Sequence, residues 1–261
     1  MPADPTSEPR ARRRRPKRGR LLAQRIVDDI CELGLVDGDR LPPEAVLMQT
    51  YNAGRSTFRE ALRILEANGV VRVQPGPGGG PVVSGADAPD LADTLMLHLQ
   101  VRRATYEDVA GARVLIEPYL ARLAAERRDP TALDHLRAVM ADIEAADLDD
   151  KATFNALDGE FQRALGQGSG NRVVDLLGTL LVEIYDQHFF DVAEMPVSER
   201  ADVVRWWRRI TDDILDGRAD DAERHVRRMI EYTTSRFSSQ YPKESGQSVR
   251  WGELHGREAA S

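Results

Sequence analysis

The sequence predicts a mainly α-helical protein in two parts: a small N-terminal domain that contains a few strand residues, and a larger antiparallel helical bundle. Its 261 residues are 41% hydrophobic and 30% charged, which is typical of a globular chain long enough for two domains. Residues that favour strands gather only at 70–83, among glycines and prolines. From residue 88 onward, apolar residues recur every three or four positions in seven successive segments.

The first segment, residues 1–19, is predicted to be a disordered basic arm. Proline, serine and charged residues dominate it, and it has no apolar period. The basic run from Arg12 to Arg18 has two interpretations. Either it contacts the phosphates of a nucleic acid, or it is a solvated tail without a specific role.

Residues 20–84 are predicted to form three helices and a β-hairpin. The helices are expected at 20–33, 43–51 and 55–68, because apolar residues in these stretches keep helical spacing. Residues 70–74 and 82–83 are predicted to pair as two strands around a glycine-rich tip. Two short helices with a three-residue turn between them, followed by such a wing, predict a winged helix-turn-helix.

The start of the third helix carries side chains suited to DNA. Its first five residues include Arg55, Ser56, Thr57 and Arg59. Guanidinium groups bind guanine edges through two hydrogen bonds, hydroxyls suit phosphates or base edges, and a helix N-terminus attracts phosphate. The alternative is that Ser56 and Thr57 only cap the helix and that both arginines are solvated.

Seven helices are predicted behind the hairpin, joined by short loops, which together indicate an antiparallel bundle over residues 88–240. The polar residues 241–261 are predicted to form a flexible tail. The expected helices are 88–102, 105–127, 130–147, 151–167, 171–191, 198–216 and 218–239.

The net charge of −7 is unevenly distributed. Residues 1–83 carry 14 Lys and Arg against 10 Asp and Glu, whereas the remaining residues carry 22 against 33. A basic N-terminal part followed by an acidic C-terminal part indicates that only the N-terminal part binds a polyanion.

Several classes of protein are not expected. No uninterrupted apolar run reaches 18 residues, so no membrane partner is predicted. The single cysteine, Cys31, excludes an internal disulfide, fits a reduced cytoplasmic setting, and is expected to be buried as a small apolar residue. The chain has no nucleophile elbow, no His-Glu-x-x-His and no Walker loop, so we do not expect an enzyme.

The amino-acid sequence of residues 40–83 closely resembles that of the GntR superfamily of bacterial regulators. This resemblance implies a DNA-binding transcription regulator whose contacts are made by Arg55, Ser56, Thr57 and Arg59 of the recognition helix and by Gly76 of the wing. One position departs from the family, because Ala45 stands where many members have an arginine. The stretches that carry the resemblance are Arg40–Glu44, Gly54–Leu62, Leu65–Val71 and Gln74–Val83.

The rear part resembles, more loosely, the helical FCD effector domain of the FadR-like branch of that superfamily. The resemblance implies a domain that binds a small molecule and a protein that acts as a homodimer. It is carried by Arg113–Pro118, Ala121–Ala125, Asp158–Gln162, Gly170–Asn171, Trp207–Ile214 and Gly217–Ile230.

Many members of this branch hold a divalent metal with one aspartate and three histidines. Here Asp158 stands at the aspartate position, but Gln162, Trp207 and Met229 stand where the histidines are expected. An indole N–H cannot be a ligand, and amides and thioethers are poor ligands for Zn²⁺ or Mn²⁺. We therefore predict no metal and no other cofactor.

The resemblance places an effector pocket at Arg113, Glu117, Asp158, Gln162, Trp207 and Met229. Arg113 matches the family position that often pairs with a carboxylate of the effector, although Glu117, four residues later, could instead pair with it inside the helix. The apolar replacements indicate an aromatic or acyl effector.

The predicted function is a ligand-responsive repressor. We expect it to leave a palindromic operator when it binds a small carboxylate-containing or acyl or aromatic metabolite. The alternatives are an architectural DNA-binding protein without an effector, and a metal-dependent carboxylate sensor.

Overall fold

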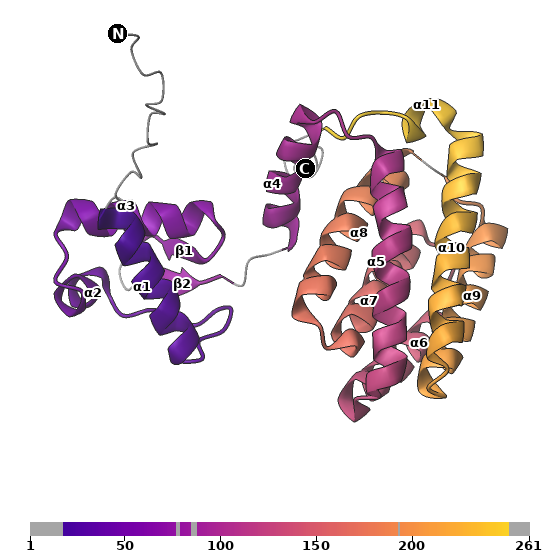
Figure 1. The fold of residues 1–261 in the computed structure, drawn as a ribbon, viewed down its shortest axis with the longest axis horizontal. Coiled ribbons are helices and arrows are strands. Elements are labelled where there is room, and N and C mark those ends of the chain that lie inside the picture. The colour runs from indigo at the N-terminus through magenta and orange to yellow at the C-terminus, as the bar shows by residue number, and fades with distance from the viewer. Residues whose placement is uncertain (1–17, 77–78, 85–87, 193, 251–261) are drawn as a thin grey trace, which may run out of the picture. The chain divides into compact units, whose positions relative to one another are not determined.

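The computed structural model describes residues 18–76, 79–84, 88–192 and 194–250 of the chain (Figure 1). It divides into two compact units, residues 1–87 and 88–261, and each has its own core. The predicted fold class is confirmed, because helices dominate both units and, among the described residues, the strands occur only in the first.

The N-terminal unit has the three helices and the hairpin that the sequence predicts. The strands pair antiparallel, with Val71 opposite Val83 and Gln74 opposite Gly80. The first helix starts earlier than expected, so that Arg18 and Gly19, which we had assigned to the arm, are helical. The elements are α1 (Arg18–Glu32), α2 (Glu44–Thr50), α3 (Arg55–Ala67), β1 (Val71–Gln74) and β2 (Gly80–Val83).

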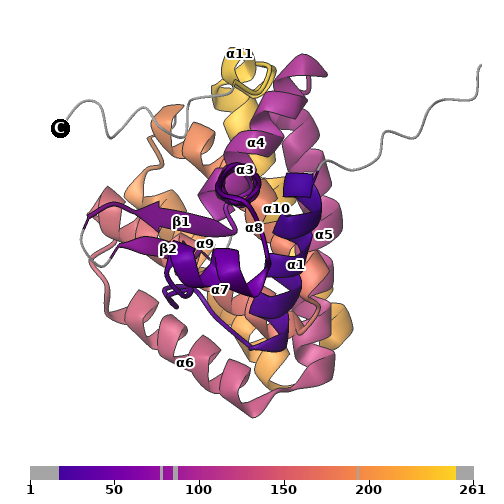
Figure 2. The ribbon, with the colours of Figure 1, turned by 90° about the vertical axis from the view of Figure 1, so that its left-hand side faces the viewer.

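The apolar face of α3 packs against α1 and fixes the orientation of the helix. Phe58 and Ala61 of α3 are fully buried, and Ile26 of α1 lies in the same cluster. The hairpin is tied to this core by the loop that follows α1: Leu41 N–H donates to the carbonyl of Pro81, and Val83 N–H donates to that of Asp39, at 3.0 and 2.8 Å. Figure 2 shows the two strands beside the short helices.

One prediction about this unit is wrong. Cys31 was expected to be buried, but it is exposed at the last turn of α1. The buried face of α1 is formed by Leu22, Ala23, Ile26 and Ile30, so that Cys31, one position after Ile30, is rotated away from the core.

In its described residues, the C-terminal unit has the seven predicted helices and one short additional helix. Side-chain caps define several of the boundaries: Thr105 and Asp108 form a reciprocal capping box on α5, and Asp129 and Asp150 accept N–H groups at the starts of α6 and α7. No described helix combines the length and the apolar content that crossing a membrane requires. The helices are α4 (Ala88–Val101), α5 (Tyr106–Arg127), α6 (Pro130–Ala145), α7 (Lys151–Ser169), α8 (Arg172–Val192), α9 (Val197–Leu215), α10 (Ala219–Gln240) and α11 (Pro242–Ser245).

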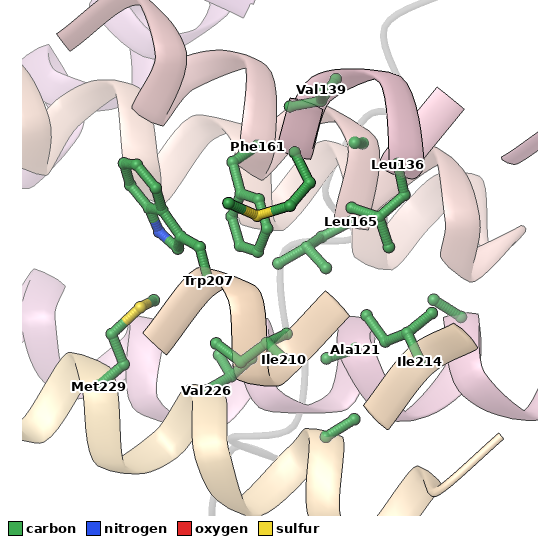
Figure 3. Close-up of a cluster of buried hydrophobic side chains, with 14 of the residues drawn as sticks. Ala121, Leu136, Val139, Phe161, Leu165, Trp207, Ile210, Ile214, Val226 and Met229 are labelled. Carbon is green, nitrogen blue, oxygen red and sulfur yellow. The ribbon is translucent and has the colours of Figure 1, made fainter. Parts of the chain in front are cut away.

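The main core of this unit lies between α5, α6, α7, α9 and α10. Figure 3 shows Trp207 and Ile210 of α9 facing Phe161 and Leu165 of α7, with Met229 of α10 next to the indole. Trp207 is 0% exposed and stacks on both Phe154 and Phe161, with ring centroids 5.4 and 5.3 Å away.

The segment after α10 differs from the predicted flexible tail, because it is structured as far as Arg250. Val249 is fully buried, and its N–H donates to the carbonyl of Ala104 at 2.9 Å. Tyr106 N–H donates to the carbonyl of Gln247 at 3.1 Å. These backbone bonds hold the segment against the start of α5, and the polar composition of the tail gave no indication of them.

Helix α5 contains Pro118 near its middle. Proline has no N–H to donate to the carbonyl four residues earlier, which here belongs to Val114. Arg227 of α10 donates to that carbonyl from its Nη1 atom at 2.9 Å. A side chain from the neighbouring helix therefore replaces the missing bond of α5.

Candidate nucleic-acid interface and ligand pocket

The N-terminal end of α3 presents polar side chains to solvent. Arg55, Ser56 and Arg59 are exposed and Thr57 is half-buried, while Phe58 points into the core. The N-cap residue is Gly54, and no side chain caps the helix. The alternative in which Ser56 and Thr57 serve as caps therefore has no support, and the first N–H groups of α3 are open to an anion.

The arginines of this surface contrast with those of the C-terminal unit, most of which sit beside carboxylates. Among the residues that the structure describes, neither Arg55 nor Arg59 forms an ion pair, and both are exposed. Ala45, at the position where the family often has an arginine, is also exposed on α2. The helix thus offers two uncompensated guanidinium groups.

The wing requires its glycines. Gly76 has a φ of +104°, a conformation that other residues rarely adopt. A Cβ on Gly79 would lie 2.2 Å from the carbonyl oxygen of Gln74, so that no side chain fits there. Pro77 and Gly78 lie outside the described residues. Backbone at such a tip can approach a partner closely.

The C-terminal unit encloses a pocket among α5, α7, α8, α9 and α10. Its cavity volume is only about 40 Å³, and it is partly open to solvent. Four of the six predicted effector residues line it: Arg113, Asp158, Gln162 and Met229. The other lining residues are Phe154, Tyr185, Asp186, Phe189, Met195, Val203, Ile230 and Thr233.

The other two predicted residues are near the pocket but do not line it. Glu117 is 1% exposed and lies behind Arg113. Trp207 belongs to the core, where it stacks on Phe154, and Phe154 in turn faces the pocket. These two residues act on the pocket through the side chains that they hold in place.

Several of the lining residues were not predicted from the sequence, among them Phe154, Tyr185 and Phe189, although their helical spacing could have indicated them. Phe154, Asp158 and Gln162 stand at every fourth position of α7 and so share one face. On α8, Tyr185 and Phe189 have the same spacing. His188, on the same helix, is not among the described lining residues; it stacks on Tyr106, with ring centroids 3.5 Å apart.

All three guanidinium nitrogens of Arg113 already donate hydrogen bonds to carboxylates. Its Nε donates to Glu117 at 2.5 Å, its Nη2 to the second oxygen of Glu117 at 3.4 Å, and its Nη1 to Asp186 at 3.1 Å. Burial disfavours the charge of Arg113, but the attraction of Glu117 and Asp186 outweighs burial and raises its pKa. The internal pair between Arg113 and Glu117, left open by the sequence, is present.

Besides Asp186, the other acidic side chain that lines the pocket is Asp158. Burial, together with the negative charge of Asp186, raises the pKa of Asp158 well above its usual range. Burial also raises the pKa of Glu117. Three acidic side chains thus surround one guanidinium.

The residues at the family's metal position do not fit a metal. Of Asp158, Gln162, Trp207 and Met229, only the aspartate is a strong ligand, and the indole is held between two phenyl rings with no lone pair to offer. In the described part of the chain, no group of three His, Cys, Asp or Glu side chains is placed to hold an ion. The absence of a metal remains a prediction that elemental analysis can test.

We expect the purified protein to contain no stoichiometric transition metal, and EDTA to leave its melting temperature unchanged. A triple variant, Gln162→His with Trp207→His and Met229→His, supplies the three imidazoles that the family uses and should acquire Zn²⁺ binding, measured by titration. Zinc, manganese or nickel found bound to the wild-type protein at Asp158 would refute this prediction.

Comparison with known proteins agrees with both units. The family described as bacterial regulatory proteins, gntR family, matches residues 20–79, and the FCD domain matches residues 108–232. The HTH-type transcriptional repressor NanR of Salmonella newport is 30% identical over 193 residues, which cover 69% of this chain and 70% of NanR. NanR of Salmonella typhimurium is 28% identical over 190 residues, which cover 69% and 70%.

Among solved structures, the chain is similar to Streptococcus agalactiae GntR. The TM-score is 0.66 at 26% sequence identity, and the alignment covers 82% of this chain and 98% of that one.

Proposed function

The chain belongs to the GntR family of bacterial regulatory proteins and carries an FCD domain, and from this premise we propose that it is a repressor that a small molecule releases from its operator. As a member of this family it is a DNA-binding transcription regulator and not an enzyme. We further propose that it acts in the bacterial cytoplasm as a homodimer, with the N-terminal unit on DNA and the C-terminal unit binding the effector.

The observation that carries the DNA-binding proposal is the exposed start of α3. Arg55 and Arg59 are exposed without an ion pair among the described residues, and the helix N-terminus is uncapped by any side chain. We propose that these arginines read bases in the major groove, that Ser56 and Thr57 contact phosphates or base edges, and that Gly76 brings the wing backbone close to the duplex.

The operator can be found by selection. Genomic fragments retained by the purified protein would be sequenced, and we expect a near-palindrome with two half-sites, because a two-fold dimer presents its two recognition helices symmetrically. Retention of fragments without a shared sequence would instead favour the architectural alternative.

On that operator, Arg55→Ala and Arg59→Ala should each weaken binding by about 1–3 kcal/mol, because each removes a guanidinium from a base edge. Fluorescence anisotropy at fixed salt measures the change. Arg137→Ala on α6 is the matched control: it removes one exposed guanidinium, paired with Asp134, from the other unit and should leave the affinity unchanged. Full affinity in both α3 variants would refute this role for the helix.

The homodimer proposal is supported by apolar side chains left exposed on two neighbouring helices. Helix α8 packs closely on α5 at Gly178, where a Cβ would lie 2.7 Å from Leu120. On the outside of this pair the exposed fractions reach 70% for Leu115 and 68% for Val173. Apolar groups gathered in this way are typical of an interface. The set is Leu115, Tyr119, Val173, Leu176 and Leu177.

We expect the double variant Val173→Glu with Leu177→Glu to be monomeric at micromolar concentration in light scattering, because a two-fold interface brings the new charges together. Operator affinity should fall at least about tenfold, since each half-site is then bound alone. Val36→Glu, at an exposed apolar residue of the N-terminal unit, is the control and should leave the dimer intact. A wild-type protein that is itself monomeric would refute the proposal.

The effector site is proposed to be the pocket lined by Arg113, Asp158, Gln162 and Met229. The pocket is narrow and must widen to admit a metabolite, and its walls combine aromatic and thioether groups with a few polar ones. Because Arg113 is held by Glu117 and Asp186, the contacts favour the apolar or aromatic alternative over an effector recognised by its carboxylate.

A further inference from the structure

The pocket has no basic group free for an anion. Among the described residues that line the pocket, Arg113 is the one basic side chain, and it donates to Glu117 through two nitrogens and to Asp186 through the third. Its guanidinium also covers the ring of Tyr185, with Cζ 4.7 Å from the ring centroid. A ligand carboxylate could reach Arg113 only by displacing one of these partners.

The acidic groups, in contrast, exceed what Arg113 can neutralise. Asp158 of α7 and Asp186 of α8 both line the pocket, and Glu117 lies directly behind Arg113. A carboxylate placed here would meet these acidic side chains and no free cation, so that nothing would offset its charge. A cation would instead meet two acidic side chains from facing helices, and on binding would displace the proton that Asp158 holds in its hydrogen bond with Asp186.

A second observation points to a bound molecule at the same place. Tyr185 lines the pocket and is 5% exposed, and within the described residues its phenol oxygen has only a weak contact with the side chain of Thr234 and no hydrogen bond of ordinary geometry. A buried hydroxyl without a partner is unfavourable, which makes such a group a candidate ligand contact. The remaining walls include the rings of Phe154 and Phe189, which suit a flat apolar body.

We propose that this pocket binds a small arylalkylamine, with its ammonium group between Asp158 and Asp186 and its aromatic body against Phe154 and Phe189. The proposal deepens the effector role proposed above and rests on it. The ammonium donates to the two acidic side chains, and the guanidinium of Arg113 keeps Asp186 in position from behind. Specificity follows from charge, because an acid of the same shape is repelled.

The test uses two probes of nearly equal size and opposite charge, the phenethylammonium ion and 3-phenylpropanoate. Each is titrated into the full-length protein at neutral pH by calorimetry. We expect phenethylammonium to bind at least about tenfold more tightly than the carboxylate. Asp158→Asn keeps the shape of the side chain but removes the carboxyl group that can give up its proton and pair with the ammonium, and should weaken binding of the amine by at least about tenfold.

Glu160→Gln is the matched control, because Glu160 lies on the same helix but pairs with Arg163 outside the pocket. It should leave the affinity for phenethylammonium unchanged. Tighter binding of the carboxylate, equal binding of the two probes, or binding of neither would overturn the proposal. If Asp158→Asn does not fold, the comparison of the two probes on the wild-type protein still decides.

Operator binding, measured on the same samples, separates this proposal from the one on which it rests. A protein that binds its operator but prefers the carboxylate, or ignores both probes, refutes only the proposed class of ligand. A protein that binds no specific DNA refutes the proposed function itself.

Discussion

Replacing Arg113 with methionine is expected to lower the free energy of unfolding of the C-terminal unit by about 3–5 kcal/mol. The reason is that Glu117 and Asp186 would remain buried without the cation that both now contact, with side chains only 1% and 16% exposed. Urea denaturation followed by circular dichroism measures the change. At temperatures where the variant remains folded, its affinity for the operator should be retained, because α3 lies in the other unit.

Two further variants separate this explanation from simple loss of packing. Arg113→Met combined with Glu117→Leu removes one of the two stranded acids and should be more stable than Arg113→Met alone. Arg137→Met, which breaks an exposed pair with Asp134, should cost less than about 1 kcal/mol. If Arg113→Met costs no more than this surface control, the buried cluster does not stabilise the domain as described.

The second large effect is expected at Trp207. Trp207→Ala should destabilise the C-terminal unit by about 3–5 kcal/mol, because it leaves a cavity where the indole stacks on Phe154 and Phe161. Thermal and urea unfolding measure the loss. The same variant should also weaken ligand binding, since Phe154 lines the pocket on its other side.

Trp207→Phe should cost roughly half as much or less. The phenyl ring keeps most of the stacking, and the change also removes a buried indole N–H that has no hydrogen-bond partner among the described residues. The neighbouring Trp206 is only partly buried, so Trp206→Ala serves as the control and should be milder than Trp207→Ala. Equal losses at the two tryptophans would contradict this assignment.

The positions of the helices could be predicted because their signals are local. Apolar spacing places α9 within a residue or so of its observed ends, and the same spacing puts Val203, Trp207 and Ile214 on its buried face. Family resemblance assigned Trp207 to the pocket wall instead. The periodicity was the better guide, since a side chain with no exposure belongs to the core.

The electrostatics of the pocket could not be predicted, because they depend on packing between distant segments. The pair between Arg113 and Glu117 is visible at a spacing of four residues, but Asp186 is 73 residues away from Arg113 and reaches it only when α8 packs on α5. For the same reason, the backbone hydrogen bond between Val249 and Ala104 could not be predicted.

The bond between Arg227 and the carbonyl of Val114 has a mechanical consequence. Arg227 lies two residues from Met229, which lines the pocket, and Val114 follows Arg113, which also lines it. Any ligand that rotates or shifts α10 must therefore strain the one interruption in the hydrogen-bond ladder of α5. The outer face of α5 carries Leu115 and Tyr119, two of the residues assigned to the dimer contact. We thus expect Pro118 to act as a flexible joint, at which a small displacement in the pocket becomes a bend of the helix that carries part of the proposed dimer contact.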